Sequence, residues 1–220
     1  HINRIFKSKK IKIHHIKKRI LNGEARNIGV YKSSEKSNFI AFCDSDDWWK
    51  KDKLKKQIDF IQKQNGRICC TNYDFYNPNS KSIIKNYFKI PFTTINFSML
   101  SYKNLIGTSS VLVEKNLFLE IGGFPIGNFF YSFEDYFLWL KLANKNFIYF
   151  LDENLTVYRD DRQNSATKYS RSFVSQRCRL MLYYLCKLEI KNLFTLSISY
   201  LKILKSIIFN EKKNEYINLL

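Results

Sequence analysis

An acidic cluster holds the residues of this sequence best suited to chemistry. Asp44-Ser45-Asp46 follows directly on the apolar run Phe39–Cys43. On an extended segment, residues i and i+2 face the same side, so the two carboxylates could be aimed at one ligand. Carboxylates suit Mg²⁺ and Mn²⁺, which are usually held by one or two of them together with substrate phosphates. The alternative is an aspartate-rich turn that only caps the next helix.

The elements around this cluster predict an α/β fold. Phe39–Cys43 has the length and continuous apolarity of a central strand buried on both faces. Asp44 and Asp46 then lie beyond its carboxyl end, which is where open α/β sheets bind ligands. Further strands are expected over 67–76, 111–113, 147–151 and 155–158. Because strands alternate with helices, the sheet is expected to be mostly parallel, with helices on its flanks.

Three helices are expected in the same region. The first covers 23–34, with Asn22 as its N-cap. The second covers 51–64, and its apolar side chains repeat at helical spacing: Leu54, Ile58 and Ile61. The third covers 134–144 and begins with the acidic pair Glu134-Asp135.

Several blocks of sequence, in the same order, resemble family 2 glycosyltransferases. They cover about residues 10–165 and are Asn22–Gly29, Phe39–Trp49, Lys53–Ile58, Gly107–Val111, Ile121–Phe124 and Glu134–Leu140. A D-x-D motif alone is weak evidence, whereas ordered blocks are specific. The resemblance implies a GT-A fold and an inverting, metal-dependent transfer of sugar from a nucleotide-diphosphate sugar. Many such enzymes build bacterial surface polysaccharides, including lipopolysaccharide.

The resemblance implies a donor site built from four residues. Asp46 would be the direct ligand of Mn²⁺ or Mg²⁺ and bridge to the diphosphate, and Asp44 would contact the donor ribose or assist the metal. Arg26 resembles the arginine that lies on the nucleotide; otherwise it is an ordinary surface charge on a helix. Asn22 is either a donor ligand or a helix cap. Three small residues, Thr108, Ser109 and Ser110, either line the donor-sugar pocket or simply form a turn.

Glu134 and Asp135 resemble the acidic pair on the acceptor side. An inverting transfer needs one carboxylate to take the proton from the acceptor hydroxyl. We assign that base to Asp135, with Glu134 supporting it or binding the acceptor. The alternative is that both residues only favour a helix N-terminus electrostatically. Three tryptophans either stack on sugars or belong to the core: Trp48, Trp49 and Trp139.

Two departures from the family pattern affect this prediction. Only about twenty residues precede Asn22, so the nucleotide-binding strand and acidic turn that open such enzymes are missing. The GT-A-like domain, placed at 1–170, is therefore expected to be N-terminally incomplete. An inactive remnant that acts as a binding module is the alternative function. Second, Tyr158-Arg159 is followed by Asp160, Asp161 and Arg162 where many relatives have a His. Asp161 takes over that role, or the role is lost.

Residues 171–220 are expected to form amphipathic helices. Their apolar stripe contains Leu193, Leu196, Tyr200, Ile203, Leu204 and Ile207, opposed by Thr195, Ser199, Lys202 and Ser206. Such a helix could lie in the interface of an anionic membrane. The alternative is that the stripe packs on the domain or on a second copy.

Composition narrows the partners. The net charge of +18 favours an anionic partner. No nucleic-acid-binding motif is present, so we expect no nucleic acid. The family resemblance instead implies a UDP-sugar donor and a glycan or lipid-linked acceptor. The five cysteines form no C-x-x-C pair, which favours a reducing compartment. Together with the resemblance to enzymes of bacterial surface-polysaccharide synthesis, this predicts a cytoplasmic protein at the cytoplasmic face of the bacterial inner membrane.

Overall fold

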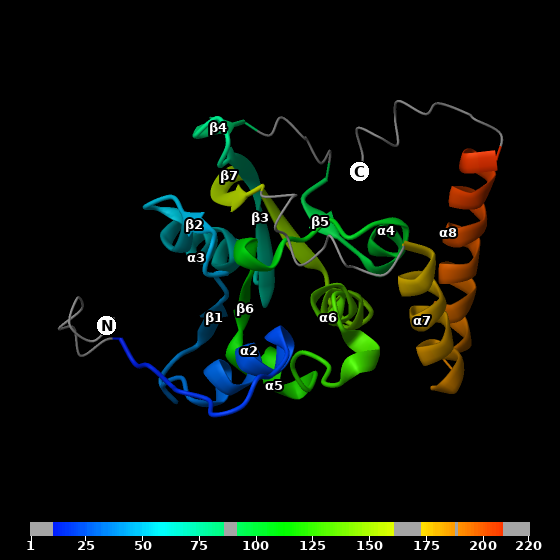
Figure 1. The fold of residues 1–220 in the computed structure, drawn as a ribbon, viewed down its shortest axis with the longest axis horizontal. Coiled ribbons are helices and arrows are strands. Elements are labelled where there is room, and N and C mark those ends of the chain that lie inside the picture. The colour runs from blue at the N-terminus through cyan, green and yellow to red at the C-terminus, as the bar shows by residue number, and fades with distance from the viewer. Residues whose placement is uncertain (1–10, 86–91, 161–172, 188, 209–220) are drawn as a thin grey trace.

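A computed structural model describes residues 11–85, 92–160, 173–187 and 189–208 of the chain (Figure 1). Its centre is a seven-stranded sheet of order β1-β6-β3-β7-β2, with β4 paired to β3 and β5 paired to β7. The strands are β1 (Phe39–Ala41), β2 (Trp48–Trp49), β3 (Ile68–Asn77), β4 (Ser82–Ile84), β5 (Thr94–Ile95), β6 (Leu112–Glu114) and β7 (Ile148–Arg159). The helices are α2 (Asn22–Tyr31), α3 (Lys53–Lys63), α4 (Phe97–Tyr102), α5 (Lys115–Glu120), α6 (Glu134–Ala143), α7 (Phe173–Cys186) and α8 (Ile190–Ile208), with 3₁₀ turns η1 (Thr108–Ser110) and η2 (Asn128–Phe130).

The sheet is mixed rather than mostly parallel, which corrects the predicted pairing while keeping the α/β class. Only the β3–β7 pairing among the described strands is parallel. β1 and β3 do run in the same direction, as a strand–helix–strand unit through α3 requires. However, β6 lies between them and pairs antiparallel with both. The prediction followed the order of elements along the chain, and that order does not reveal a strand inserted from far downstream.

β1 is shorter and less buried than the predicted central strand. It spans three residues, all half-buried, and stands at the end of the strand order. Among the described strands it pairs only with β6. The apolar run Phe39–Cys43 therefore marks a strand whose faces are covered but whose edge is open in the part of the chain that the structure describes.

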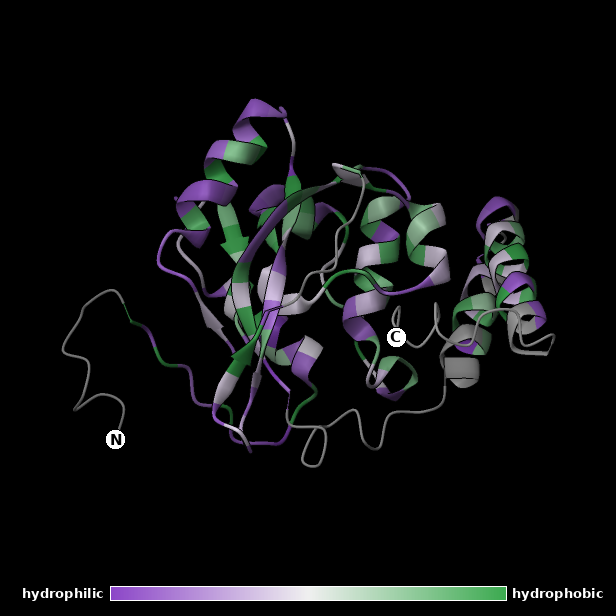
Figure 2. Cartoon of the chain, turned by 90° about the horizontal axis from the view of Figure 1, so that it is seen from above, coloured by the Kyte–Doolittle hydropathy of each residue, from purple (hydrophilic) through white to green (hydrophobic). Residues whose placement is uncertain are grey.

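Helices cover both faces of the sheet. On one face, Ile61 of α3 packs with Cys69 of β3 and Leu112 of β6. On the other, side chains of α2, α5 and α6 pack with the alternate strand positions, such as Cys70 and Val113. Figure 2 shows the hydrophobic segments gathered in the strands and in the helices packed against them. This three-layer arrangement brings the starts of α2 and α6 to the same side of the sheet.

The buried face of α3 differs from the predicted one. Ile61 is fully buried, but Leu54 is 39% exposed, and the other buried positions are Lys53 and Gln57. Gln57 Nε2 donates to the Ser110 carbonyl over 2.9 Å, and Lys53 Nζ donates to Gln57 Oε1 over 2.7 Å. Apolar spacing predicted that the buried face of α3 would be apolar, but polar side chains occupy part of it. They can do so because η1 supplies a hydrogen-bonding partner there.

The remaining predicted elements agree more closely with the structure. β3 and α6 lie within a residue of their expected bounds, and the two short strands expected over 147–158 form one strand, β7. That strand changes register opposite Thr71 and Asn72 of β3. The C-terminal helices α7 and α8 lie side by side at one end of the molecule (Figure 1). None of the helices in the described ranges is long and apolar enough to cross a bilayer.

Candidate active site

The turn Asp44–Asp47 follows β1, as the sequence predicts. The Asp47 N–H donates to the Asp44 carbonyl over 3.1 Å and closes the turn. Asp44 is half-buried, whereas Asp46 is exposed. Among the described residues the Asp46 carboxylate has no hydrogen-bonding or ionic partner, in contrast to those of Asp44 and Asp47. An exposed carboxylate without a protein partner retains all its oxygen lone pairs for an external ligand.

Asp47 is a structural carboxylate of this turn that the sequence analysis did not identify. Its Oδ2 accepts from Ser109 Oγ over 2.6 Å, and its Oδ1 accepts from the Arg159 N–H over 3.1 Å. Ser109 Oγ also accepts from the Asp44 N–H over 3.0 Å. Burial raises the pKa of Asp47, and the hydrogen bonds from Ser109 and Arg159 act in the opposite direction. Asp47 therefore ties the turn to η1 and β7.

The residues of η1 hold the site from inside. Thr108, Ser109 and Ser110 are 2%, 0% and 1% exposed. They lie on a buried turn, which agrees with the second of the two interpretations that the sequence left open. The Ser109 carbonyl accepts from Trp49 Nε1 over 2.7 Å, and Thr108 Oγ1 donates to Asp135 Oδ2 over 3.3 Å. One short turn thus contacts both acidic clusters.

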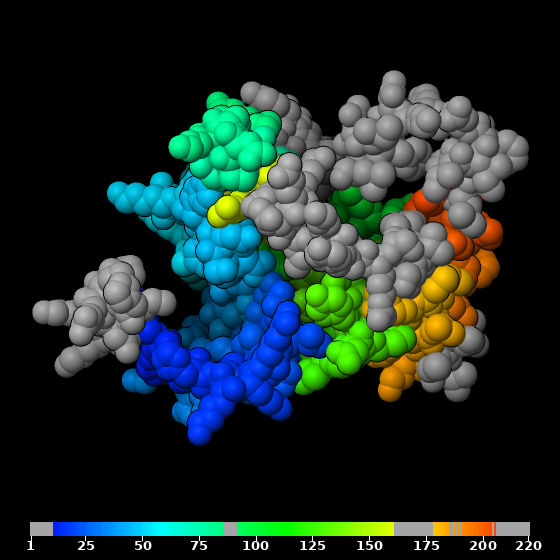
Figure 3. All heavy atoms as spheres, viewed as in Figure 1, coloured from blue at the N-terminus to red at the C-terminus, as the bar shows by residue number. Residues whose placement is uncertain are grey.

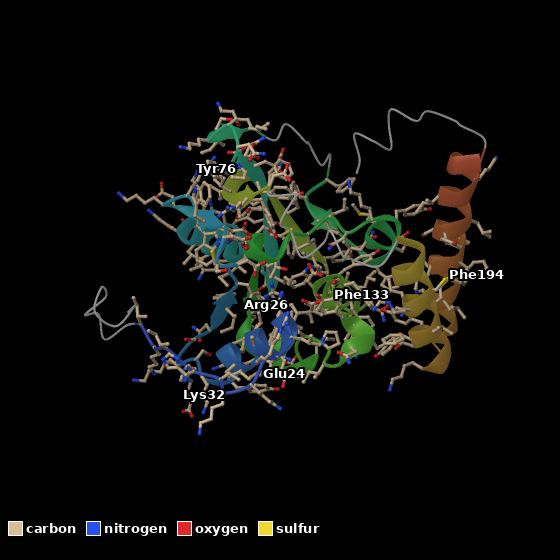
Figure 4. The ribbon with its side chains drawn as sticks, viewed as in Figure 1. Glu24, Arg26, Lys32, Tyr76, Phe133 and Phe194 are labelled. Atoms are coloured by element: carbon tan, nitrogen blue, oxygen red, sulfur yellow. The ribbon has the colours of Figure 1, made fainter. Side chains whose placement is uncertain are left out.

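Arg26 joins the two acidic clusters. Its Nη2 lies 2.6 Å from Asp44 Oδ1, and its Nη1 lies 3.4 Å from Glu134 Oε1. The side chain is 16% exposed, so Arg26 is not the ordinary surface charge of the alternative interpretation. Burial works to lower the pKa of Arg26, but the charge and hydrogen bond of Asp44 outweigh it and the pKa is raised. Figure 4 shows Arg26 on α2, near the middle of the molecule.

Close packing of α2 against the turn after α5 positions Arg26. Asn27 Nδ2 donates to the Phe124 carbonyl over 2.8 Å, and Asn27 Oδ1 accepts from the Phe124 N–H over 2.9 Å. Gly123 has φ +67°, and a Cβ there would come within 2.5 Å of Asn27 Oδ1. A Cβ at Gly23 would come within 3.0 Å of Glu134 Cγ. Gly123 therefore lets the turn after α5 approach α2 closely, and Gly23 lets α2 approach the start of α6.

Asp135 lies at the start of α6 and is less exposed to solvent than Asp46. Its Oδ1 accepts from the Tyr136 N–H over 2.7 Å. Burial, followed by the neighbouring charge of Glu134, raises the pKa of Asp135 to about 6, although Arg26 and the two hydrogen bonds oppose the rise. A carboxylate of this basicity is ionised at neutral pH yet accepts a proton more readily than an ordinary aspartate.

The other predicted site residues are spread more widely. Asn22 is exposed on the first turn of α2, one helical turn before Arg26, and Leu21 instead occupies the N-cap position, with no side-chain cap bond. The expected cap is therefore wrong, because the helix begins one residue earlier. Trp139 is fully buried in the core, and Trp48 is 39% exposed, with its ring 5.2 Å from that of Tyr76. Asp161 lies outside the described residues.

A cleft of about 460 Å³ runs between α2 and β1. Arg26 and Asp44 line it together with apolar residues of both elements, including Val30 and Ile40. Its volume falls within the range of small-molecule sites. The cleft therefore places an apolar-lined space directly beside the paired Arg26 and Asp44.

The acidic turn fits a divalent cation that is completed by substrate. Among the described residues, no group of three or more His, Cys, Asp or Glu side chains is arranged to hold a metal. Mg²⁺ and Mn²⁺ do not require such a group when phosphate oxygens supply the other ligands. In the described part of the chain, the Asp46 carboxylate has no partner and offers hard oxygen ligands, whereas Asp44 Oδ1 already pairs with Arg26. The residues present therefore fit Asp46 as the principal ligand.

Comparison with known proteins decides the family. The model described as Glycosyl transferase family 2 matches residues 2–121, more than half of the chain. The chain belongs to glycosyl transferase family 2. The match includes Arg26, Asp44 and Asp46 but ends before Glu134.

Relatives of the chain include named bacterial glycosyltransferases. The UDP-Glc:alpha-D-GlcNAc-diphosphoundecaprenol beta-1,3-glucosyltransferase WfgD of Escherichia coli is 36% identical over 122 residues, which cover 56% of this chain and 44% of the relative. The putative teichuronic acid biosynthesis glycosyltransferase TuaG of Bacillus subtilis (strain 168) is 28% identical over 136 residues, which cover 61% and 51%. The chain thus spans about half the length of these relatives.

A solved structure supports the fold independently. The crystal structure of S. aureus TarS 1-349 in complex with UDP-GlcNAc matches with a TM-score of 0.55 at 19% identity, covering 76% of this chain and 48% of that one. The likeness confirms the predicted GT-A class of α/β fold.

Proposed function

We propose that this chain transfers a sugar from a nucleotide-diphosphate sugar to a hydroxyl of a glycan or lipid-linked acceptor in cell-surface polysaccharide synthesis. The observation that carries the proposal is Arg26, which contacts Asp44 of one acidic cluster and Glu134 of the other. Donor and acceptor residues must meet where the bond is made, and these two clusters meet at one guanidinium. A UDP-sugar is the proposed donor, in keeping with the name of the E. coli relative WfgD, a UDP-Glc-dependent glucosyltransferase.

The reaction requires few groups from the protein. Asp135 takes the proton from the acceptor hydroxyl while the oxygen of that hydroxyl attacks the anomeric carbon. The bond from that carbon to the diphosphate breaks, the nucleoside diphosphate leaves, and the configuration inverts. Arg26 fixes Asp44 and balances the charge of the surrounding carboxylates. Asp46, with Asp44 beside it, would hold a divalent cation, Mn²⁺ or Mg²⁺, which would supply positive charge for the departing diphosphate.

The cleft beside Arg26 is the proposed place for the nucleoside. Its lining combines an apolar wall with Arg26 and Asp44 at one end. A guanidinium can stack on a base or hydrogen-bond to phosphate, and a carboxylate can accept from ribose hydroxyls. Asn22 stays a candidate donor ligand because it lies one turn from Arg26 on the same face of α2.

Nucleotide release from a panel of nucleotide sugars tests this function. The purified chain is incubated with Mn²⁺, each donor and an acceptor, beside Asp46→Ala and Asp135→Ala variants. We expect release by the unmodified chain and a loss in both variants. Equal turnover in all three proteins would contradict the mechanism. A folded chain that binds donor but never transfers would instead favour a binding module, an alternative motivated by the coverage of about half of each relative.

A further inference from the structure

Helix α8 has two faces with different surroundings. Its inner face carries Leu196 and Ser199, each 1% exposed, and packs against α4. The hydroxyls of Ser199 and Ser101 lie 2.6 Å apart in this contact. Leu196 belongs to the apolar stripe read from the sequence, whereas Ser199 was placed on the opposing polar side. Two members of this stripe, Leu196 and the partly buried Leu193, therefore pack on the domain.

The opposite face of α8 carries exposed apolar side chains. Phe194 is 66% exposed and Leu201 is 63% exposed. Each is two residues from a buried position, Leu196 or Ser199, which is a rotation of about 200° around a helix. These two residues therefore point away from the domain. Figure 3 shows α8 at one end of the molecule, and Figure 4 labels Phe194 on it.

Lysines flank these apolar residues on the same face. Lys191 and Lys205 are both exposed, and they are the two ends of the series Lys191, Phe194, Ile198, Leu201 and Lys205. Successive members are three or four residues apart, the spacing of one helical stripe. We call this series the outer stripe. α8 contains no acidic residue along its length, and Lys187 and Lys202 nearby are also exposed.

This combination of charge and apolarity selects one kind of partner. In a twofold contact between copies, lysines at both ends of the outer stripe would face lysines, and no carboxylate on α8 could neutralise them. A nucleic acid would match the lysines but leave Phe194 and Leu201 in water. An anionic bilayer surface accommodates both, because apolar side chains enter the acyl boundary while lysines stay among the headgroups.

We propose that the outer stripe of α8 seats the protein on an anionic membrane surface, with Phe194 and Leu201 inserted and Lys191 and Lys205 among the lipid headgroups. The helix lies along the surface and does not cross it. This inference is independent of sugar transfer, because it rests only on the exposure and charge of α8. Its failure would therefore leave the proposed function intact.

Co-sedimentation of the full chain with vesicles tests the apolar part of this proposal. The vesicles contain either phosphatidylcholine alone or phosphatidylcholine with phosphatidylglycerol. We expect binding to the anionic vesicles, and a loss of at least about tenfold in affinity for the double variant Phe194→Ser/Leu201→Ser. The matched control is Ile83→Ser/Ile84→Ser on β4, where the side chains are 52% and 51% exposed and lie far from α8 in Figure 1. This control is expected to bind like the unmodified chain.

A charge-reversal pair tests the electrostatic part. Lys191→Glu/Lys205→Glu is expected to lose binding by about tenfold or more, since each lysine near an anionic surface contributes severalfold. The control Lys55→Glu/Lys63→Glu makes the same change of charge at exposed positions of α3. Equal losses in both pairs would reduce the effect to net charge and overturn the assignment to α8. So would equal binding to neutral vesicles, or sedimentation velocity showing a dimer that Phe194→Ser/Leu201→Ser dissociates.

Discussion

The two acidic clusters of the site, one in the turn after β1 and one at the start of α6, place their carboxylates in different environments. Asp46 is exposed and has no partner among the described residues, whereas Asp135 is held by Thr108 and the Tyr136 N–H, with its pKa raised to about 6. A carboxylate of the first kind is open to a cation, and one of the second kind is tuned to accept a proton. Arg26 lies between the two acidic clusters and contacts both.

The comparison shows that the surroundings, rather than residue type, separate binding from proton transfer. Asp44, Asp46 and Asp47 lie within four residues of one another. Among the described residues, however, Asp44 pairs with Arg26, Asp46 has no partner, and Asp47 accepts one hydrogen bond at each carboxylate oxygen. Each environment suggests a different consequence of mutation. The expected losses run from the base, through the cation ligand and the arginine, to the supporting serine.

Loss of the base should have the largest effect. Asp135→Asn is expected to lower the transfer rate by about 10²–10⁴-fold, the usual contribution of general acid–base catalysis. Because the pKa of Asp135 is raised to about 6, the rate of the unmodified chain should fall about tenfold per pH unit below pH 6. Initial rates from pH 4.5 to 8 measure this. A variant that keeps the same acid limb would show that another group supplies the base.

Asp135→Asn also carries its own control for folding. Burial makes the folded state favour the protonated carboxyl, so stability contributed by Asp135 decreases as pH rises from the usual aspartate range to about 6. At pH 7 the neutral amide avoids that cost, and the variant should be as stable as the unmodified chain or up to about 2 kcal/mol more stable. Urea unfolding at pH 7 checks this. A strongly destabilised variant would make its low activity uninformative.

Asp46→Asn sharpens the comparison from the other side. Removal of a partner that only orients a metal ligand typically costs 10–100-fold in affinity, so loss of a direct ligand should raise the Mn²⁺ concentration for half-maximal transfer by more than about 100-fold. Asp47→Asn is the matched variant, one residue away, with both oxygens already used by the protein. Similar Mn²⁺ dependence in the two variants would remove the distinction between these aspartates.

Arg26→Lys tests the link that Arg26 makes between the two acidic clusters. Lysine keeps the charge but cannot reach Asp44 and Glu134 with two nitrogens at once. We expect donor affinity to fall by roughly tenfold, the equivalent of one charge-assisted hydrogen bond of about 1.5 kcal/mol. Lys32→Arg, at the end of the same helix, is a control for exchanging a lysine and an arginine side chain. An unchanged donor affinity in Arg26→Lys would mean that the link is only structural.

Ser109→Ala should have the smallest effect. The substitution removes the hydroxyl shared by Asp47 and the Asp44 N–H while leaving the backbone of η1 in place. A loss of about 1–2 kcal/mol in unfolding free energy is expected, because half-buried Asp47 loses a donor. Mn²⁺ affinity should fall only severalfold through a looser turn. Ser109→Thr should restore much of it, unless the turn is held by the backbone alone.

Local patterns predicted what depends on neighbours in sequence. The bounds of β3 and α6 follow from apolar runs and helical spacing, and the order of the blocks carried the family. Arg26 and Asp44 were expected at one site, and the structure brings them within 2.6 Å.

What the sequence did not reveal depends on contacts between distant residues. The place of β6 between β1 and β3 could not be read from the order of elements. Gln57 is buried because the Ser110 carbonyl, 53 residues later, accepts its hydrogen bond. Likewise, among the described residues Asp47 differs from Asp46 by its hydrogen bonds from Ser109 and Arg159, and no local sequence pattern marks either partner.

Calorimetry of UDP binding tests most directly whether cation binding belongs to Asp46 and proton transfer to Asp135. The titration is made with and without Mn²⁺ on the unmodified chain, Asp46→Asn and Asp135→Asn. We expect Mn²⁺ to strengthen UDP binding by the unmodified chain and by Asp135→Asn equally, and we expect Asp46→Asn to lose this effect. If Asp46→Asn retained the full Mn²⁺-dependent gain in affinity, the assignment of cation binding to Asp46 would be wrong.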